Sequence, residues 1–392
     1  MVKKTLKKQS RYKKSKKIIL VSNSSWYLYN FRFPLLKLLE EKGFSIELVA
    51  PYDSYTKKIE KAGYKVNYWV LNRRSINPIK ELKSLLDLIY LFKRIKPNLV
   101  HNFTIKACLY STIATKFSNI NIVVNSITGL GQIFIGGKPL HLLLRFFLRP
   151  FYKFVFKRNN SIVIFQNKSD QEKLISLGIT DIRKTKIIKG SGVDIHLFKP
   201  SNLKNKNYLI PKILFPSRLI YEKGIKELLV ACDLLWNKNI NFKLIIAGGI
   251  EFANSSYINK TDFLKIKKHK NISLLGHVSN MHKLYESAYL VVLPSWREGL
   301  SRTLIESAAM EKPIITTNVS GCRDVIDHGI NGILVPKKDP KSLSLAIELL
   351  LKNPKFAKKL GLSARKKVIN EFQVKHINNQ TINTYKELLF ER

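Results

Sequence analysis

Acidic residues are scarce in this chain of 392 residues, which contains 27 Asp and Glu but 69 Lys and Arg. The resulting formal net charge of +42 attracts anionic partners such as nucleic acid or anionic lipid. A general bias towards Lys, Ile and Asn is the alternative explanation, in which much of this charge is a solvated surface. At this length we expect two domains, each with a core of its own.

Cysteines are few, and long apolar runs are absent. Cys108, Cys232 and Cys322 lie far apart without the spacing of a metal or redox site, so we expect small core residues in a reducing compartment. No apolar segment reaches the roughly 18 residues of a membrane-spanning helix. The run IILVS near the start is too short for a signal peptide. We therefore expect a cytoplasmic protein.

Common nucleotide and nucleic-acid motifs are absent as well. In GLGQIFIGGKP, Gly129, Gly131 and Gly136 miss the G-x-G-x-x-G spacing, and a P-loop ending at Lys138 would need glycine at Gln132. No recognition helix, zinc spacing or RNP-like aromatic motif accompanies the basic residues, so specific nucleic acid is not an expected partner. None of the ten aspartates is followed two positions later by another, which excludes an Asp-x-Asp metal motif.

Strand and helix patterns alternate along two parts of the chain. From residue 18, short apolar runs such as KIILVSN, SIELVAP and NLVHNF alternate with amphipathic stretches, as in βαβ units around a parallel sheet. The pattern restarts after the polar stretch 199–211 with KILFPSR, FKLIIAGG and AYLVVLPS. This predicts an α/β fold of two doubly wound, Rossmann-like domains facing a central cleft, with ligands at the carboxyl ends of both sheets.

The pattern divides the chain into four segments. They are a basic disordered tail at 1–17, an N-terminal domain at 18–199, a C-terminal domain at 200–372 and a closing helix at 373–392. The tail holds nine basic residues and no acid between positions 3 and 17, so we expect it to seek membranes or anions.

Two cations follow the first strand of the C-terminal domain in FPSRLIYEKGIKELL. Arg218 falls just past the strand and Lys223 just before the next helix, so both would project at the carboxyl edge beside a helix N-terminus. Charge-assisted hydrogen bonds and the helix dipole favour a diphosphate there. The alternative is two exposed cations in a lysine-rich protein.

Two glutamates stand eight residues apart in REGLSRTLIESAAMEKP. The pattern places Glu298 in the loop after a strand and Glu306 in the first turns of the next helix, where both could accept hydrogen bonds from sugar hydroxyls. Gly299 lets the backbone approach a ligand, and the N–H groups at 301–303 can meet a phosphate. The alternative for Glu306 is a capping box in TLIE, which begins at Thr303.

The stretches SRLIYEKG and PSWREGLSRTLIESAAMEKPIITTNVSGCRDVIDHGINGILVP resemble the C-terminal domain of the family-4 retaining glycosyltransferases with the GT-B fold. The resemblance extends over nearly the whole chain and is most specific at 294–336. It implies that Arg218 and Lys223 hold the diphosphate of a nucleotide sugar, that Glu306 holds the ribose hydroxyls, and that Glu298 is a catalytic residue beside the donor sugar. The donor-binding residues that it implies are Arg218, Lys223, Gly299, Leu300, Ser301 and Glu306.

The reaction that the resemblance implies is transfer of a hexose or N-acetylhexosamine with retention of configuration, driven mainly by stabilisation of the leaving nucleoside diphosphate. The missing Asp-x-Asp motif belongs to the other large glycosyltransferase class, so we expect no required metal, and no cofactor is expected. A UDP-sugar is the expected donor, with GDP-mannose left open. The alternatives are a UDP-sugar epimerase of similar two-domain shape and a basic nucleic-acid-binding protein.

The N-terminal stretches VSNSSWYLYNFRFPLLKLLEEKG, HNFTIKA and SITGLGQIF resemble one bacterial branch of this family. That branch adds sugars to lipid-linked or polysaccharide precursors and includes N-acetylgalactosaminyltransferases acting on undecaprenyl diphosphate sugars. The resemblance implies that the N-terminal domain binds a lipid-linked or glycan acceptor. The acceptor-side candidates are Asn23, Asn30, Arg32, Thr128 and Gly129.

A histidine that many relatives carry is missing here, because Thr128 stands before Gly129 where the histidine is expected. His101, in VHNFTIK, follows a different strand and is a candidate catalytic residue. The other interpretation of His101 is a structural histidine.

Basic residues recur at every fourth position in KPLHLLLRFFLRPFYKFVFKR, residues 138–158. A helix there would carry a basic stripe between apolar faces, as in an interfacial helix on anionic lipid. Together with the tail, it would dock the N-terminal domain peripherally on the inner face of the cell membrane. The alternative is a core helix with snorkelling cations, and Pro150 would kink either one. The residues of the stripe are His141, Arg145, Arg149, Lys153 and Lys157.

Overall fold

The computed structural model describes residues 15–72, 75, 77–130, 139–201, 210–250 and 256–390, without the side chains of 139–142, 144 and 147. The chain forms two compact units. The first unit runs to Ile188 and resumes at Asn378, and the second spans Lys189–Ile377.

The boundary between the two units falls after Ile188, whereas the sequence pattern predicts it at Lys199. Val193 forms backbone hydrogen bonds with Phe372 and Val374, so the chain has already joined the second unit before Lys199. The expected closing helix does not stand apart, because its residues from Asn378 onward pack in the first unit. Of the expected tail, residues 1–14 lie outside the described part, and Lys17 begins a strand.

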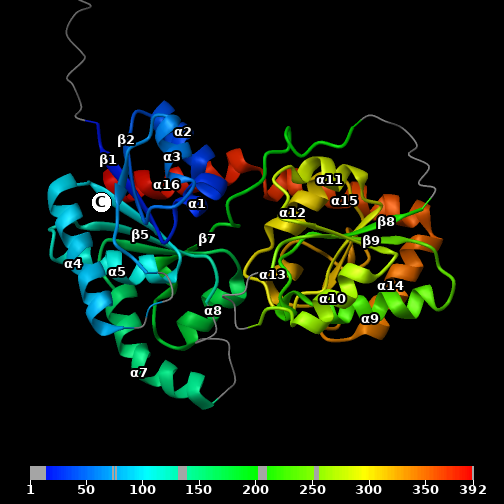
Figure 1. Ribbon diagram of the computed structural model, residues 1–392. Coiled ribbons are helices and arrows are strands. Elements are labelled where there is room, and N and C mark those ends of the chain that lie inside the picture. The colour runs from blue at the N-terminus through cyan, green and yellow to red at the C-terminus, as the bar shows by residue number, and fades with distance from the viewer. Residues whose placement is uncertain are drawn as a thin grey trace, which may run out of the picture. The chain divides into compact units, whose positions relative to one another are not determined.

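A seven-stranded parallel sheet with the order β3-β2-β1-β4-β5-β6-β7 forms the centre of the first unit. Its strands are β1 (Lys17–Ser22), β2 (Ser45–Ala50), β3 (Val66–Tyr68), β4 (Leu99–Phe103), β5 (Ile122–Ile127), β6 (Ser161–Phe165) and β7 (Thr185–Ile187). Its helical segments are α1 (Ser25–Tyr27), η1 (Leu28–Arg32), α2 (Phe33–Glu41), α3 (Thr56–Lys61), α4 (Pro78–Ile95), α5 (Ile105–Lys116), α7 (Pro139–Phe156), α8 (Lys168–Ser176), η2 (Ile182–Lys184) and most of α16 (Val374–Phe390). Figure 1 shows α4, α5 and α7 on one side of this sheet and α2, α3 and α16 on the other.

The first sheet consists of apolar runs because helices on both faces of a parallel sheet bury its side chains. β4 and β6 are buried at every position, and β1 is buried at every position after Lys17. β1, β4 and β5 lie side by side, so the residues that follow them gather at one carboxyl edge. Asn23, Thr104 and Thr128 lie at this edge, directly after those strands.

The segment after β1 is helical, although a loop from Asn23 to Arg32 is the sequence-based expectation. Ser24 starts the helix by accepting a hydrogen bond from the backbone N–H of Tyr27. The following segment η1 has π-helical geometry and leads directly into Pro34, which has no N–H to continue an α-helical ladder. Helix geometry therefore fixes the side chains that were expected to lie in a loop.

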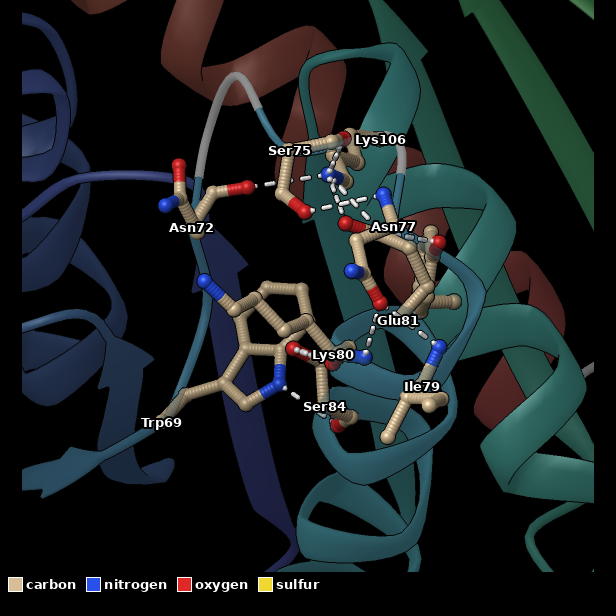
Figure 2. A network of polar contacts seen from close by, with 10 residues as sticks. Trp69, Asn72, Ser75, Asn77, Ile79, Lys80, Glu81, Ser84 and Lys106 are labelled. Atoms are coloured by element: carbon tan, nitrogen blue, oxygen red, sulfur yellow. Dashed lines mark hydrogen bonds and ion pairs between the residues drawn. The ribbon is translucent and has the colours of Figure 1, made fainter.

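A polar network joins Asn72 and Ser75, which lie between β3 and α4, to residues of α4 and α5 (Figure 2). Nζ of Lys106, in the first turn of α5, donates to the carbonyl oxygens of Asn72 and Ser75 over 2.9 and 3.0 Å. The same Nζ lies 2.8 Å from Oε2 of Glu81 in α4. Burial raises the pKa of Glu81, but hydrogen bonds from Lys106 and Tyr110 lower it by more, so that it lies below its usual value. A charged Glu81 thus joins α4 to α5.

The second unit contains a six-stranded parallel sheet with the order β10-β9-β8-β11-β12-β13. Its strands are β8 (Lys212–Phe215), β9 (Lys243–Ala247), β10 (Ile272–Gly276), β11 (Leu290–Leu293), β12 (Ile314–Thr317) and β13 (Ile333–Val335). Its helical segments are η3 (Tyr221–Lys223), α9 (Ile225–Trp236), α10 (Lys260–Lys268), α11 (Met281–Ser287), α12 (Arg302–Ala309), α13 (Ser320–Arg323), α14 (Pro340–Lys352) and α15 (Pro354–Glu371). Figure 1 shows α11, α12 and α15 on one side of the sheet and α9, α10 and α14 on the other.

Both units confirm the predicted α/β fold of two doubly wound parallel sheets. Among the described residues, no helix has both the length and the hydropathy needed to cross a membrane. Most of the polar stretch predicted between the domains, residues 202–209, lies outside the described part.

Candidate active site

The loops after β8 and β11 leave the second sheet side by side, because these two strands are neighbours. The loop after β8 carries Arg218 and leads through η3 to Lys223 and α9, while the loop after β11 carries Glu298 and leads to α12. This carboxyl edge is where ligands bind in open α/β sheets. The fold therefore places the predicted cations and Glu298 on adjacent loops.

Lys223 and Glu298 form an ion pair in which Nζ of Lys223 lies 2.6 Å from Oε1 of Glu298. The hydroxyl of Ser295 donates to the same oxygen over 2.8 Å. The side chains of Lys223 and Glu298 are only 19% and 10% exposed. Because both contacts with described residues go to Oε1, Oε2 of Glu298 remains as an acceptor for a ligand hydroxyl.

Trp296 anchors the same loop to the start of α9. Its backbone N–H donates to the carbonyl oxygen of Glu222 over 2.8 Å, and its indole N–H donates to Oε1 of Glu227 over 3.1 Å. Nζ of Lys338 lies 4.1 Å from the centre of a Trp296 ring, within the range of a cation–π interaction. These contacts hold the backbone just before Glu298 in one position.

Two glycines let other backbone segments approach this loop closely. A Cβ at Gly224, whose φ is +77°, would lie 2.0 Å from the carbonyl oxygen of Pro294. A Cβ at Gly321 would lie 2.4 Å from the carbonyl oxygen of Gly299 and 2.8 Å from that of Glu298. Such contacts with backbone atoms cannot be relieved by a side-chain rotation, so the loop conformation depends on glycine at both positions.

Glu306 lies in the second turn of α12, in agreement with the sequence-based placement. Nε of Arg302 donates to its Oε1 over 2.7 Å, and the hydroxyl of Tyr285 donates to its Oε2 over 3.2 Å. Burial raises the pKa of Glu306, and the charge of Arg302 offsets part of this rise. Both carboxylate oxygens therefore already accept a hydrogen bond from the protein.

The capping-box alternative for Glu306 is wrong, because it requires Thr303 as the N-cap. Ser301 is the N-cap of α12, and Thr303 donates its hydroxyl to the carbonyl oxygen of Pro216 over 3.3 Å. The side chain of Ser301 accepts no capping hydrogen bond from the described residues of this helix. By helix geometry the first N–H groups of α12 lack intrahelical acceptors and, with the helix dipole, suit an anion.

The other predicted donor-site residues lie on the same two loops. Arg218 is exposed, and the backbone N–H of the next residue, Leu219, donates to the carbonyl oxygen of Gly249 over 3.1 Å. Gly299 and Leu300 are half-buried, and Ser301 is buried. The structure thus brings this set of residues to one edge of the second sheet.

A buried thiol lies close to the ion pair. Burial, and then the charge of Glu298, raise the pKa of Cys322 to about 12, so this cysteine is a protonated core residue. Cys108 and Cys232 are buried as well, which confirms the prediction of small core residues.

His101 lies in the middle of β4 and is buried. Its Nδ1 contacts the hydroxyl of Tyr385 in α16, and its Nε2 lies 2.7 Å from the hydroxyl of Ser126 in β5. Burial, and to a smaller extent the charge of Arg32, hold the pKa of His101 well below its usual value. A neutral imidazole whose two nitrogens both contact protein hydroxyls fits the interpretation of His101 as a structural histidine.

Two acceptor-side candidates are used within the helix that follows β1. Nδ2 of Asn30 donates to the carbonyl oxygen of Trp26 over 2.9 Å. Arg32 is buried, its Nη2 donates to the hydroxyl of Tyr27 over 3.0 Å, and its guanidinium lies 4.4 Å from the centre of the Phe103 ring. Both side chains therefore hold this helix in place in the described structure.

Three acceptor-side candidates lie at the carboxyl edge of the first sheet. Asn23 is half-buried directly after β1, and Thr128 and Gly129 are half-buried after β5. Gly129 has a φ of +144°, and among the described residues no heavy atom lies within 4 Å of a Cβ placed there.

The predicted basic stripe falls on α7, whose interior contains Pro150. Arg149, Lys153 and Lys157 are exposed and Arg145 is half-buried, while the side chain of His141 lies outside the described part. The opposite side of the helix is a core face, because Tyr152, Val155 and Phe156 pack in a buried cluster with residues of α5 and β6.

Four residues of the site, Arg302, Ser295, Trp296 and Tyr285, were not predicted from the sequence. The spacing of Arg302 and Glu306 is a visible i,i+4 signal for an ion pair. Ser295 and Trp296 stand in the motif just before Glu298, but the partners of Trp296, Glu222 and Glu227, lie 69 or more positions away around the start of α9. Nothing in the sequence pattern points to Tyr285, because its contact depends on the packing of α11 against α12.

Two family models match the chain. The model described as "Glycosyl transferases group 1" matches residues 196–367, and the model described as "Glycosyl transferase 4-like" matches residues 17–167. The chain is a group 1 glycosyltransferase. The first match contains the whole candidate site of the second unit.

Two named relatives align with this glycosyltransferase over most of their length. The capsular polysaccharide biosynthesis glycosyltransferase CapM of Staphylococcus aureus is 27% identical over 368 residues, which cover 91% of this chain and 93% of the relative. The N,N'-diacetylbacillosaminyl-diphospho-undecaprenol alpha-1,3-N-acetylgalactosaminyltransferase of Campylobacter jejuni is 27% identical over 365 residues, which cover 89% and 93%.

Solved structures share the fold of this glycosyltransferase. A glycosyltransferase from Rickettsia africae superimposes with a TM-score of 0.79 at 23% identity and covers 97% of this chain and 100% of its own. Anabaena HepE in complex with UDP and glucose gives a TM-score of 0.76 at 19% identity, covering 94% and 99%. At these identities the likeness shows the fold alone.

Proposed function

We propose that this enzyme transfers a hexose or N-acetylhexosamine from a UDP-sugar to a lipid-linked diphosphate sugar during polysaccharide or glycan biosynthesis. The donor class is supported by the solved relative that holds UDP and glucose. The acceptor class is supported by the name of the Campylobacter relative, which is a transferase onto a diphospho-undecaprenol sugar. The observation that carries the proposal is the Lys223–Glu298 pair, which joins the segment that leads into α9 to the loop that leads into α12.

In this proposal the second unit, assigned to 200–372 from the sequence, binds the donor. The diphosphate lies among Arg218, Lys223 and the N–H groups at 299–303, and Oε2 of Glu298 accepts a hydrogen bond from a sugar hydroxyl. As the bond from the anomeric carbon to the diphosphate breaks, negative charge grows on the leaving group, and the cations and helix dipole stabilise it. Lys223 has three ammonium protons, so it can donate a hydrogen bond to the diphosphate while it stays bonded to Glu298.

The role proposed for Glu306 is to hold the ribose. Its oxygens already accept hydrogen bonds from Arg302 and Tyr285, so a ribose hydroxyl would add to these bonds or replace the longer one. Replacement of the bond from Tyr285 is favoured because a carboxylate with a raised pKa gains from a strong donor at close range.

We also propose that the transfer retains the anomeric configuration and needs no metal. The support for metal independence is that Arg218, Lys223 and the α12 dipole supply the positive charge that a divalent ion would bring to the diphosphate. Proton NMR of the product's anomeric coupling tests retention, and unchanged transfer in EDTA tests metal independence.

The first unit, assigned to 18–199 from the sequence, is proposed to bind the acceptor and to face the membrane. Asn23, Thr128 and Gly129 are the residues that we propose to contact the acceptor, because they lie at the carboxyl edge of the first sheet. We assign His101 a positioning role, in which it holds α16 against β4. Peripheral association of α7 with anionic lipid is proposed from its exposed cations, and no specific nucleic acid is proposed as a partner.

Mass spectrometry of a lipid-linked acceptor tests this function directly. Incubation with UDP-sugars and an undecaprenyl diphosphate sugar should add one hexose or N-acetylhexosamine to the acceptor, and Arg218→Ala should lose most of this product. Lys226→Ala is the matched control, because Lys226 is an exposed cation in the first turn of α9. Interconversion of the UDP-sugar without any acceptor product would instead favour an epimerase.

A further inference from the structure

A basic depression of about 720 Å³ lies in the first unit, away from the acceptor-side residues. Four cations line it: Lys116 at the end of α5, and Lys153, Lys157 and Arg158 at the end of α7. Three asparagines, Pro150 and Phe154 complete the lining, which contains no carboxylate. This lining suits an anion that is attached to an apolar group.

The depression lies at the amino edge of the first sheet. Lys116 and Asn121 come just before β5, and residues 157–160 come just before β6, so all of them lie at the ends where these parallel strands begin. Asn23 and Thr128, in contrast, follow their strands at the carboxyl edge. Strands of five or six residues separate the two edges by roughly 17–20 Å, so this is a second site.

The cations in this depression repel one another. Burial, and then the charge of Arg158, lower the pKa of Lys116, whose Nζ lies 3.3 Å from the centre of the Phe154 ring. The carboxylate of Asp181 offsets little of this charge, because Arg183 binds both of its oxygens at 3.1 and 3.0 Å. Hydrogen bonds of Arg183, with a smaller effect of Lys157, lower the pKa of Asp181 to about 2. An added anion would therefore relieve the repulsion.

Apolar side chains extend along α7 from this depression. Leu143, Phe146 and Phe154 are 55%, 73% and 57% exposed. At about 100° per residue they share one face of the helix with Lys153 and Lys157. Charges beside exposed aromatic and aliphatic groups match the boundary between lipid headgroups and acyl chains. A site for free phosphate would not need the apolar groups.

We propose that this depression binds the phosphate headgroup of an anionic membrane lipid and seats the exposed face of α7 on the bilayer. The 18 residues of α7 extend over roughly 27 Å, and the helix ends shortly before the amino end of β6. The inference deepens the proposed peripheral association and rests on it.

Vesicle flotation of the full chain tests the headgroup site. With vesicles of phosphatidylglycerol in phosphatidylcholine, Lys116→Gln/Lys153→Gln should lower the affinity by roughly 25-fold, or about fivefold for each lysine at a membrane surface. The matched control is Lys57→Gln/Lys61→Gln on α3, which removes the same charge from exposed residues of the same unit. Arg158 is left in place because it donates to the carbonyl oxygens of Thr112 and Ile120 and so supports the fold.

The outcomes separate the headgroup site from its alternatives. An equal loss of binding in the control would overturn the proposal and assign the binding to diffuse charge. Inorganic phosphate detected in the site by phosphorus NMR, with vesicle binding unchanged in the variant, would overturn it in favour of a free-anion site. Phe146→Ser should also weaken flotation, and an unchanged affinity would contradict the apolar contact.

Transfer to a detergent-solubilised acceptor distinguishes failure of this site from failure of the enzyme function. Lys116→Gln/Lys153→Gln should keep the wild-type rate there and lose it only with acceptor in vesicles. If the wild type makes no product in either assay but still floats with anionic vesicles, the proposed function fails while the headgroup site stands.

Discussion

Replacement of Lys223 by methionine should destabilise the second unit, because it leaves the carboxylate of Glu298 without its cation. Removal of one partner of a buried ion pair costs about 3–5 kcal/mol, and the 19% and 10% exposure of these side chains places the cost near the lower figure of about 3 kcal/mol. For a domain of this size each kcal/mol shifts Tm by about 2–4 °C, so Tm should fall by about 6–12 °C. Calorimetry measures this shift.

Two further variants isolate the ion pair from other effects of the methionine. Lys226→Met makes the same substitution at an exposed lysine on α9 and should leave Tm almost unchanged. Lys223→Met/Glu298→Gln removes the uncompensated charge and should recover most of the lost stability, because a neutral amide costs less to bury. The reasoning is refuted if Lys223→Met is as stable as Lys226→Met, or if the second substitution recovers nothing.

Three other perturbations follow from the geometry. Gly321→Ala should move the loop of Glu298 and slow transfer by about 10²-fold. Gly249→Ala, where a Cβ meets no atom of the described residues within 4 Å, should not; equal rates in the transfer assay would contradict the close contact. Because the folded pKa of Glu306 is raised, wild-type stability relative to Glu306→Gln should fall as pH rises from the ordinary value of 4.5 through the folded pKa. Urea denaturation across pH checks this, and a constant difference would speak against it. Lys106→Met should cost the first unit about 3 kcal/mol by leaving Glu81 without its cation, and an unchanged urea midpoint would disprove the role of that network.

Sequence patterns predicted the two parallel sheets because helices on both faces turn each strand into an apolar run. They also placed Glu298 in a loop and Glu306 in a helix, since the apolar run before PSWRE and the amphipathic pattern after it mark the ends of β11 and the start of α12. Adjacent loops after β8 and β11 follow from the strand order of a doubly wound sheet. These features depend on local sequence or on topology that such sheets share.

Contacts between distant side chains were beyond the sequence. The bond between Lys223 and Glu298 joins residues 75 positions apart, and the contact between His101 and Tyr385 joins residues 284 positions apart. The π-helical turn before Pro34 was missed because a polar, aromatic stretch after a strand has the composition of a loop. In each case the observed structure depends on a tertiary contact or a backbone hydrogen bond that the residue pattern does not reveal.

The rate of UDP release from a UDP-sugar, with and without a lipid-linked diphosphate acceptor, tests the central claim most directly. The account predicts acceptor-dependent release for the wild type and a large loss for Glu298→Gln, which keeps the shape of the loop but removes the charge that faces Lys223. Release that is independent of any acceptor, or that is unchanged in Glu298→Gln, would contradict it.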